Sequence, residues 1–385
     1  MNSRERVLAA LQHREPDRVP FDLGGAPNAG IHADAYRNLL RYWGEEREIK
    51  IEDIVTQKAL IDEDVLRRLG VDFRRVDFSF STTERRLREL QEEEKYTFFI
   101  DEWGIKWAKP KKGVLYYDMK RHALPASQIT ADDIDALKGP ALPSRDEVRV
   151  LKKKAETYKE NGFAVVLDGT GGGIFEWACW IRGHQNFFID MVSRPALAER
   201  LLRKILSYKL KYYELMLSEL GDLVDVVAEG DDVATQERLM ISPELYRRML
   251  KPLHRELIKG IRESTKEHIF IHFHSCGAIR ELIPDLIDVG VDALNPVQVN
   301  AAGMDTKQLK KEFGKDITFW GGGVDTQHVL PHGTPEEVKD EVKRRIEDLA
   351  PGGGFIFATV HNIQADVPPE NIMAMWEALQ EYGEY

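Results

Sequence analysis

One segment of the sequence combines imidazole and thiol side chains at a spacing that suits metal binding. It runs His272-Phe273-His274-Ser275-Cys276-Gly277 and continues a short apolar stretch. If that stretch is a β-strand, residues 272, 274 and 276 share one face, because side chains alternate along a strand. Thiolate and imidazole together form a donor set that favours zinc. His274 and Cys276 are therefore candidate metal ligands, and His272 could orient a ligand from behind.

Two ligands cannot complete a zinc site, so the others must come from another part of the chain. His361 follows the last strand candidate and is the best placed nitrogen donor. Glu229, Asp231 and Asp232 follow an earlier strand candidate and are the oxygen candidates. The alternative is that His274 and Cys276 only pack in the interior, since buried cysteines are common.

The elements that would position these residues alternate between strand and helix. Short β-branched runs that end in glycine or polar residues alternate with stretches of helical periodicity. The strand candidates are residues 19–22, 73–76, 164–167, 224–228, 269–274, 293–295, 317–320 and 355–358. Amphipathic helical stretches lie between them, among others at residues 194–219, 243–264 and 335–348. This order predicts an α/β fold, a (β/α)8 TIM barrel whose chemistry lies in the loops after the strands.

An open, doubly wound sheet is the alternative architecture. The glycine-rich segment at residues 169–173 lacks the G-x-G-x-x-G spacing that such a fold uses for dinucleotides. Residues 78–145 interrupt the barrel pattern with a charged helix at 83–95 and a hairpin formed by 103–107 and 113–117. We expect one domain over residues 1–385, with this segment as an N-terminal elaboration. Trp103 could wall a substrate pocket there, or the hairpin could simply pack on the barrel.

The composition excludes several classes of protein. The chain has 385 residues, with 54 Lys and Arg against 65 Asp and Glu and a formal charge of −11. Its basic residues are scattered, so we expect no nucleic acid partner. Cys179 and Cys276 are the only cysteines, which excludes a disulfide framework and favours a reducing compartment. The sequence shows neither a secretion signal nor an apolar run long enough to cross a membrane, so we expect a cytoplasmic protein.

Further polar residues stand at the ends of the strand candidates. Barrel enzymes place acids and bases there, and we predict Asp168, Glu229 and Asp231 as catalytic groups. The alternative for any of them is helix capping or a solvated loop. The predicted substrate-binding residues are Asn295, Gln298, Asp325 and Trp103, although the two amides could also satisfy loop backbone.

Motifs spread along most of the chain occur together in one known superfamily. They are residues 4–11, 17–20, 229–236 and 241–245, the His274-x-Cys276-Gly277 segment, and residues 295–298, 322–327 and 368–371. In this combination the chain resembles the uroporphyrinogen decarboxylase superfamily, and most closely its corrinoid-linked methyltransferase branch. The resemblance implies a (β/α)8 barrel with zinc at the carboxyl ends of the strands.

In the thiol-methylating members of that branch, the zinc ligands are the H-x-C pair and a second cysteine on a later strand. The pair corresponds to His274 and Cys276, but residues 358–362, where the later cysteine would fall, contain none. His361 is our substitute for it. One thiolate and two imidazoles would leave the zinc with a formal charge of about +1, whereas two thiolates and one imidazole would neutralise it. The more electrophilic metal suits polarising the oxygen of a methyl ether or alcohol.

We therefore predict a zinc-dependent methyltransferase that moves a methyl group from a small O-methyl substrate to the cobalt of a corrinoid held by a separate partner protein. Methyl transfer from methylcobalamin to a thiol is an alternative. A decarboxylase is less expected, because the resemblance would require an arginine pair after the first strand, where this chain has Asp22. A metal-free hydrolase or lyase that uses Asp168 and Glu229 would suit the same fold, and so would a non-catalytic binding barrel. The sequence leaves open whether the chain forms a homodimer.

Overall fold

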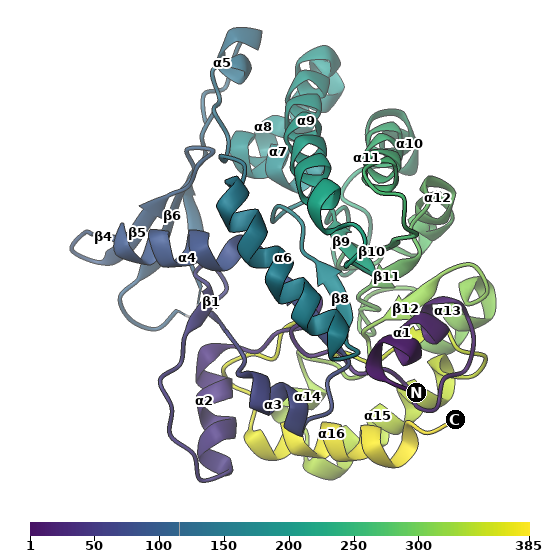
Figure 1. Cartoon of the computed structure of the whole chain (residues 1–385). Helices are drawn as coiled ribbons and strands as arrows, with labels where there is room; N and C mark the ends of the chain where they lie inside the picture. The colour runs from purple at the N-terminus through teal and green to yellow at the C-terminus, as the bar shows by residue number, and fades with distance from the viewer. Residues whose placement is uncertain (115) are drawn as a thin grey trace.

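A parallel sheet of seven strands forms the centre of the computed structural model, which describes residues 1–114 and 116–385. In the order of the sheet, neighbouring strands follow one another along the chain with no exchange of position (Figure 1). The strands are β3 (Phe73–Val76), β8 (Ala164–Leu167), β9 (Val226–Gly230), β10 (Phe270–His274), β11 (Ala293–Asn295), β12 (Thr318–Trp320) and β13 (Phe355–Ile356).

An eighth, very short segment lies between the two edge strands. Phe21 pairs in parallel with Phe357, just beyond β13. On its other side, the Phe21 carbonyl accepts a hydrogen bond of 2.9 Å from the amide of Asp72, which directly precedes β3. The segment at residues 19–22 therefore completes the ring between β13 and β3. The expectation of a (β/α)8 barrel is confirmed, and the open sheet is not found.

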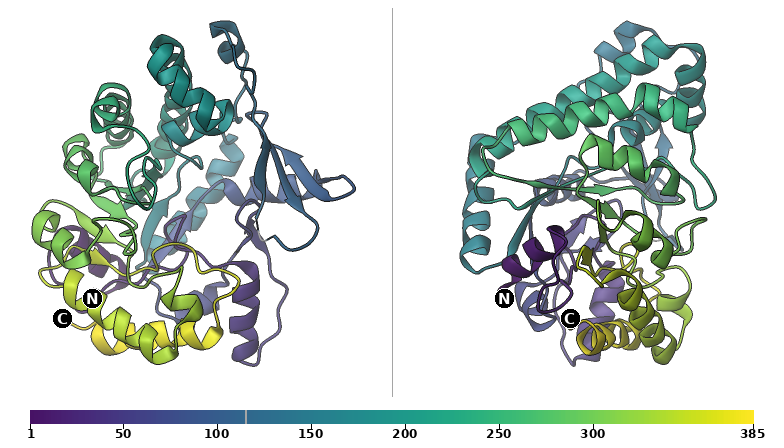
Figure 2. Two further views of the ribbon diagram at one scale, coloured as in Figure 1. Left: turned by 180° about the vertical axis from the view of Figure 1, so that it is seen from behind. Right: turned by 90° about the vertical axis from the view of Figure 1, so that its right-hand side faces the viewer.

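Helices connect the strands and surround the sheet (Figure 2). They are α1 (Ser3–Leu11), α2 (Ala33–Tyr42), α3 (Glu63–Arg68), α6 (Arg145–Glu160), α7 (Ile174–Arg182), α8 (His184–Ser193), α9 (Pro195–Leu220), α10 (Pro243–Met249), α11 (Lys251–Glu263), η1 (Arg280–Leu282), α12 (Ile283–Val289), α13 (Thr306–Phe313), α14 (Val329–His332), α15 (Pro335–Leu349) and α16 (Pro369–Tyr382). The single helix expected at residues 243–264 is two, α10 and α11. Pro252 has no N–H to continue a helix and stands in the first turn of α11. Among the described residues, none of the helices is long and apolar enough to span a membrane.

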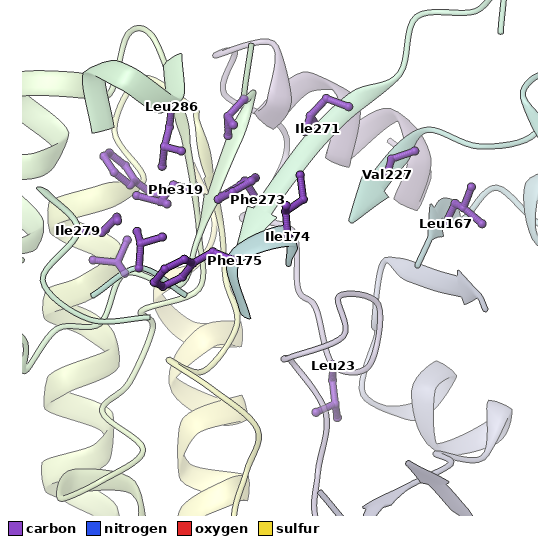
Figure 3. Close-up of a cluster of buried hydrophobic side chains, with 14 of the residues drawn as sticks. Leu23, Leu167, Ile174, Phe175, Val227, Ile271, Phe273, Ile279, Leu286 and Phe319 are labelled. Carbon is purple, nitrogen blue, oxygen red and sulfur yellow. The ribbon is translucent and has the colours of Figure 1, made fainter. Parts of the chain in front are cut away.

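The two faces of the barrel strands pack against different partners. Val166, Ala228 and Trp320 point inward and share a cluster with Val7 of α1, which covers one end of the barrel. Residues of the opposite parity point outward and pack against the helices. Figure 3 shows part of this outer layer, including Leu167 on β8, Val227 on β9, and Ile271 and Phe273 on β10. Both faces are buried, as is usual for a parallel sheet covered by helices.

The segment after β3 forms a separate antiparallel sheet that stands out from the barrel (Figure 1). Its elements are α4 (Ser79–Arg88), β4 (Gln91–Glu92), β5 (Tyr96–Ile100), β6 (Lys106–Pro110), β7 (Asp118–Arg121) and α5 (Ala131–Asp135). A further small pair, β1 (Ile51–Asp53) and β2 (Lys58–Ala59), lies earlier in the chain.

This elaboration was predicted in position but not in detail. The helix expected at residues 83–95 ends at Arg88 and is followed by a strand. A hairpin is present, but it joins β6 to β7, so the expected bounds 103–107 and 113–117 are wrong; β6 also pairs with β5 on its other side. The Asp101 carboxylate accepts the backbone N–H groups of Trp103 and Ile105, which makes residues 101–105 a turn. Residue 115 of the expected hairpin lies outside the described residues.

Candidate metal centre at the barrel mouth

The carboxyl ends of neighbouring strands bring a set of polar side chains to the inner face of the barrel. His274 lies in register with Gly230 on one side and with Asn295 on the other. Arg75 lies in register with Val166, which is part of the inner cluster, and Asp168 follows two residues later with the same parity. Because parallel strands end at the same rim, these groups face one mouth.

Three donor atoms meet at this mouth. One ligand atom each from His274, Cys276 and His361 lies within 4.8 Å of the others. The Cys276 Sγ atom is 3.4 Å from His274 Nε2. The sequence predicted these three residues as ligands, and the structure brings them together from β10 and from the loop after β13.

The distance between the sulfur and the nitrogen of this cluster matches zinc geometry. Tetrahedral zinc bonded to sulfur and nitrogen at ordinary lengths spaces the two ligand atoms by about 3.5 Å. The observed sulfur-to-nitrogen distance of 3.4 Å agrees with this value. His361 makes no side-chain hydrogen bond to any described residue, so its ring nitrogens are available for coordination.

Asn295 determines how the His274 ring presents itself. Its Nδ2 donates to the Trp320 carbonyl at 2.9 Å, which turns Oδ1 toward the imidazole. Oδ1 lies 2.6 Å from His274 Nδ1, so that nitrogen must carry the proton. The lone pair of Nε2 is thereby directed toward Cys276 and His361, which is the usual arrangement behind a metal-bound histidine.

Gly230 makes room for this ring. A Cβ atom at Gly230 would lie 2.7 Å from the Cβ of His274 and 2.6 Å from its carbonyl oxygen. Any other residue at this position on β9 would therefore push against His274.

The loop carrying Cys276 is held by two side chains from other strands. Asp232 Oδ1 accepts the Cys276 amide at 2.7 Å, and Gln298 Oε1 accepts the Gly277 amide at 2.7 Å. Burial raises the pKa of the Cys276 thiol well above its usual range, and the charges of Asp232 and Glu176 act in the same direction. Without a metal the thiol is protonated at neutral pH, so a bound cation is needed to make the thiolate.

The charge state of His361 also suits a ligand. Burial, followed by the effects of the His274 ring and the Lys58 ammonium, lowers the pKa of His361 to about 3. Its imidazole is neutral at physiological pH and keeps a lone pair for a metal. Of the three oxygen candidates, Asp232 is the one beside the cluster, with Oδ1 3.7 Å from His274 Nε2.

Comparison with known proteins places the chain in a family. The profile described as uroporphyrinogen decarboxylase (URO-D) matches residues 114–382. The chain belongs to the uroporphyrinogen decarboxylase family. It is 26% identical over 254 residues to the uroporphyrinogen decarboxylase of Geobacter sp. (strain M21), which covers 64% of this chain and 68% of that protein.

A second relative of the chain is named as a methyltransferase. The methylated-thiol–coenzyme M methyltransferase of Methanosarcina mazei is 28% identical over 145 residues, which is 37% of this chain and 34% of that protein. A solved structure described as a methyltransferase from Methanosarcina mazei covers 99% of both chains, with a TM-score of 0.65 and 19% identity. At that identity the likeness shows a shared fold.

The sequence predicts Asp231 and Glu229 as catalytic groups, but in the structure both carboxylates bind neighbouring groups of the protein. Asp231 is fully buried and accepts the amides of Phe175 and Glu176 at 2.8 and 2.9 Å, so it caps the start of α7. Its Oδ2 also accepts from His254 Nε2 at 2.9 Å. These contacts favour a role in positioning α7.

Glu229 points away from the three candidate ligands. It is in register with Phe273, on the outer face of the sheet. There its carboxylate lies 3.0 Å from Lys209 Nζ and accepts the Tyr213 hydroxyl at 2.6 Å, both on α9. Glu229 therefore neutralises a buried lysine between barrel and helix and does not reach the mouth.

Asp168 lies on the inner face of the barrel, and the pKa of its carboxyl is raised. Burial raises the pKa of its carboxyl to about 6, against the opposing effects of Arg75 and Lys58. Arg75 Nε lies 3.8 Å from Asp168 Oδ2. Sequence reasoning missed Arg75, although its alternation with Phe73 on the strand candidate at 73–76 could have revealed it.

Glu176 was also missed. Burial, together with the charges of Asp232 and Asp231, raises the pKa of Glu176 well above its usual range. Its carboxyl therefore holds a proton more strongly than an ordinary glutamate does, beside those two aspartates. The signal was available in the spacing of Gly173 and Glu176, since the Glu176 side chain accepts the Gly173 amide at 2.9 Å at the start of α7.

The other predicted substrate residues make structural contacts of their own. Trp103 is buried in an aromatic group with Trp177 and Tyr208, at ring-centre distances of 5.9 and 6.0 Å, and joins the small sheet to the barrel helices. Asp325 organises its own loop, accepting the Gln327 amide at 2.8 Å and lying 2.9 Å from His328 Nδ1. The side chains of Asn295 and Gln298 make the hydrogen bonds to His274 and to the Gly277 amide described above.

A groove of about 1230 Å³ lies beside the mouth but does not include the metal ligands. It is lined by the loops after β9, β10 and β11, with Met240, Pro284 and Phe313 among its apolar residues. The groove is therefore a surface separate from the three candidate ligands.

Proposed function

We propose that this chain is a zinc-dependent methyltransferase that moves a methyl group between a small O-methyl substrate and the cobalt of a corrinoid carried by a partner protein. One observation carries the proposal: His274, Cys276 and His361 offer three donor atoms within 4.8 Å at the barrel mouth. The methyltransferase named among the relatives supports the reaction class. The corrinoid partner rests on the resemblance of the sequence motifs.

The donor set favours the donor side of the reaction. One thiolate and two neutral imidazoles leave a divalent zinc ion with a formal charge of about +1. Bound zinc of this kind supplies Lewis acidity toward an ether or alcohol oxygen. The lowered pKa of His361 keeps its imidazole neutral, so it cannot repel the cation.

The residues of the chain itself prepare the site for this chemistry. Asn295 holds the His274 ring with Nε2 facing the other two ligands. Asp232 and Gln298 fix the backbone of the loop that carries Cys276. Asp168 stands on the inner face of the same barrel, where its carboxylate can accept a hydrogen bond from a bound substrate.

Two different functions have weaker support. A metal-free hydrolase would need Asp168 and Glu229 to face one substrate, but they lie on opposite faces of the sheet. A uroporphyrinogen decarboxylase would bind a polyanion, and the segment after residue 20 offers Asp22. The carboxylate of Asp22 is itself occupied by the amides of Gly25 and Ala26 and by Trp320 Nε1.

Metal content tests the proposal first. We would measure zinc by plasma mass spectrometry in the wild type and in His274→Ala, Cys276→Ala and His361→Ala. We expect about one zinc per wild-type chain and a loss in all three variants, with Cys179→Ala as a control that keeps the metal. Cys179 is the other cysteine and is buried in α7. A wild type that holds no zinc after reconstitution would contradict the proposal.

The direction of transfer is tested next. Zinc-loaded protein would be mixed with methoxylated compounds and a reduced corrinoid protein, and methyl–cobalt formation would be followed by absorbance. Methylation of a thiol from methylcobalamin, without demethylation of any ether, would show that the acceptor side is correct and that the charge argument is wrong.

A further inference from the structure

Arg75 is a buried arginine inside the barrel mouth with one nitrogen left unpaired. Its side chain is 4% exposed and lies on the inner face of β3. Nη2 lies 2.5 Å from Glu52 Oε1, and Nε lies 3.0 Å from Asp77 Oδ2. Nη1 is buried and has no partner among the described residues. Because an unpaired buried donor is costly, a guanidinium held this way is ready for an acceptor.

Asp168 supplies an acceptor beside this donor. It lies on the adjacent strand, with Oδ2 3.8 Å from Arg75 Nε, which is beyond hydrogen-bond distance. No described residue donates to its carboxylate in a side-chain hydrogen bond, and the side chain is 13% exposed. The mouth therefore holds an unpaired N–H group on the Arg75 guanidinium and, 3.8 Å from the Nε of the same guanidinium, the Asp168 carboxylate.

The charges around Arg75 decide what kind of group fits. Two cations, Arg75 and Lys58, stand among three carboxylates, those of Glu52, Asp77 and Asp168. The guanidinium is already paired twice, so an additional anion would meet a surplus of negative charge. A neutral hydroxyl can accept from Nη1 and donate to Asp168 at the same time.

This pair is connected to the metal ligands. Lys58 lies between the two: its Nζ is 3.7 Å from the Glu52 carboxylate that pairs with Arg75. A Cβ atom at Gly30 would lie 2.9 Å from Lys58 Cδ and 3.2 Å from the Oδ1 of Asn362, the residue after His361. The donor–acceptor pair on β3 and β8 and the ligand cluster on β10 and after β13 thus line one mouth.

We infer that Arg75 and Asp168 form a subsite that binds a hydroxyl group of the substrate, so that the substrate is a methyl ether carrying a free hydroxyl. The inference rests on the proposed function for the methyl ether, whereas the hydroxyl subsite rests on Arg75 and Asp168 themselves. Arg75 and Asp168 orient the molecule through the hydroxyl and leave the ether oxygen for the ligand cluster.

Direct binding tests the subsite without any corrinoid. Titration calorimetry and ligand-observed NMR would compare 2-methoxyphenol with methoxybenzene, and 2-methoxyethanol with 1-methoxypropane, on the zinc-loaded full chain. Loss of hydrogen bonds to charged groups corresponds to about tenfold or more in affinity. We expect the hydroxylated member of at least one pair to bind at least about tenfold more tightly. This preference should fall to about twofold in Arg75→Lys and in Asp168→Asn.

The matched control is Arg74→Lys. Arg74 is the next residue on the same strand, but it points outward to Glu63 and stacks on Phe163. This variant should keep the full preference. Circular dichroism and thermal unfolding would show that each variant is folded, and Asp168→Asn keeps the test valid if Arg75→Lys does not fold.

Three results would overturn the inference. They are an equal affinity within both pairs, no binding of any of the four compounds, and tighter binding of the carboxylates 2-methoxybenzoate or methoxyacetate than of the hydroxylated ethers. A hydroxyl preference in a protein that never transfers a methyl group would instead contradict the proposed function and leave the subsite in place. Demethylation of methoxybenzene as fast as of 2-methoxyphenol would contradict the hydroxyl subsite and support the proposed function.

Discussion

Replacing Asn295 by alanine should weaken zinc binding although no ligand is removed. In the wild type the amide of Asn295 joins the Trp320 carbonyl, at 2.9 Å, to His274 Nδ1, at 2.6 Å. The variant loses the group that keeps the proton on Nδ1 and the lone pair on Nε2. The imidazole can then rotate or adopt the other tautomer, and both changes turn the donor nitrogen away from Cys276.

The size of the effect follows from these two hydrogen bonds. Loss of the partner behind a metal-bound histidine typically costs about 10- to 100-fold in metal affinity, which corresponds to about 1.4–2.7 kcal/mol. Asn295 is 1% exposed, so its removal also leaves the Trp320 carbonyl and the His274 N–H buried and unpaired. Each unpaired group costs about 1–3 kcal/mol, and we expect the metal-free variant to be less stable by about that amount.

The assay is a competition titration of the metal-free protein with a chromophoric chelator at pH 7.5. Asn371→Ala is the matched control, because Asn371 is 2% exposed and donates to the carbonyls of Leu330 and Gly333 away from the mouth. It should lose stability and keep the wild-type dissociation constant for zinc. An Asn295→Ala variant that binds zinc within twofold of the wild type would refute the reasoning, as would an equal loss of affinity in the control.

Three further substitutions separate structural from functional side chains. Glu229→Gln should lower the free energy of unfolding by about 3–5 kcal/mol, because it leaves the Lys209 ammonium buried without a counter-charge. The zinc content should stay unchanged. Reduced zinc in the folded variant would contradict the placement of Glu229 on the outer face of the sheet. His272→Leu should not lower the thermal midpoint of unfolding. The His272 ring is fully buried, has neither nitrogen paired among the described residues and packs edge-on against Trp320. A decrease of more than about 1 kcal/mol in the free energy of unfolding would show that this ring makes a hydrogen bond. Asp168→Asn should gain stability relative to the wild type as the pH rises from about 4 to 6. The folded pKa of Asp168 is raised from 3.8 to about 6, so the folded wild type holds an extra proton in this window and loses stability as the pH rises. Urea unfolding of both metal-free proteins across that range would measure the difference, and parallel curves would disprove the shift.

The sequence by itself determined the order of elements and the pairing of His274 with Cys276 as candidate ligands. Hydrophobic runs and the polar residues after them placed seven of the eight strand candidates within a few residues of their observed positions. The eighth, at residues 19–22, pairs with its neighbours through too few bonds to form a named strand. The alternation of side chains was sufficient to put His274 and Cys276 on one face, because that rule is local to the strand.

Sequence patterns predicted the structure less well where the pairing between strands determines it. The small sheet at residues 91–121 was only partly predicted, because the turn at Asp101 depends on side-chain hydrogen bonds to backbone amides. Its strands are bounded by such turns and by their partners, neither of which a hydrophobic pattern shows.

Only the tertiary structure decided which parity of each strand faces the barrel interior. In a parallel sheet covered by helices both faces are buried, so an apolar run does not reveal its inner side. Glu229 and Asp168 look equivalent in the sequence, yet one pairs with Lys209 behind the sheet and the other reaches the mouth beside Arg75. Closure of the barrel sets this choice for every strand at once. It also brings His361 to Cys276, since strands distant along the chain share one rim.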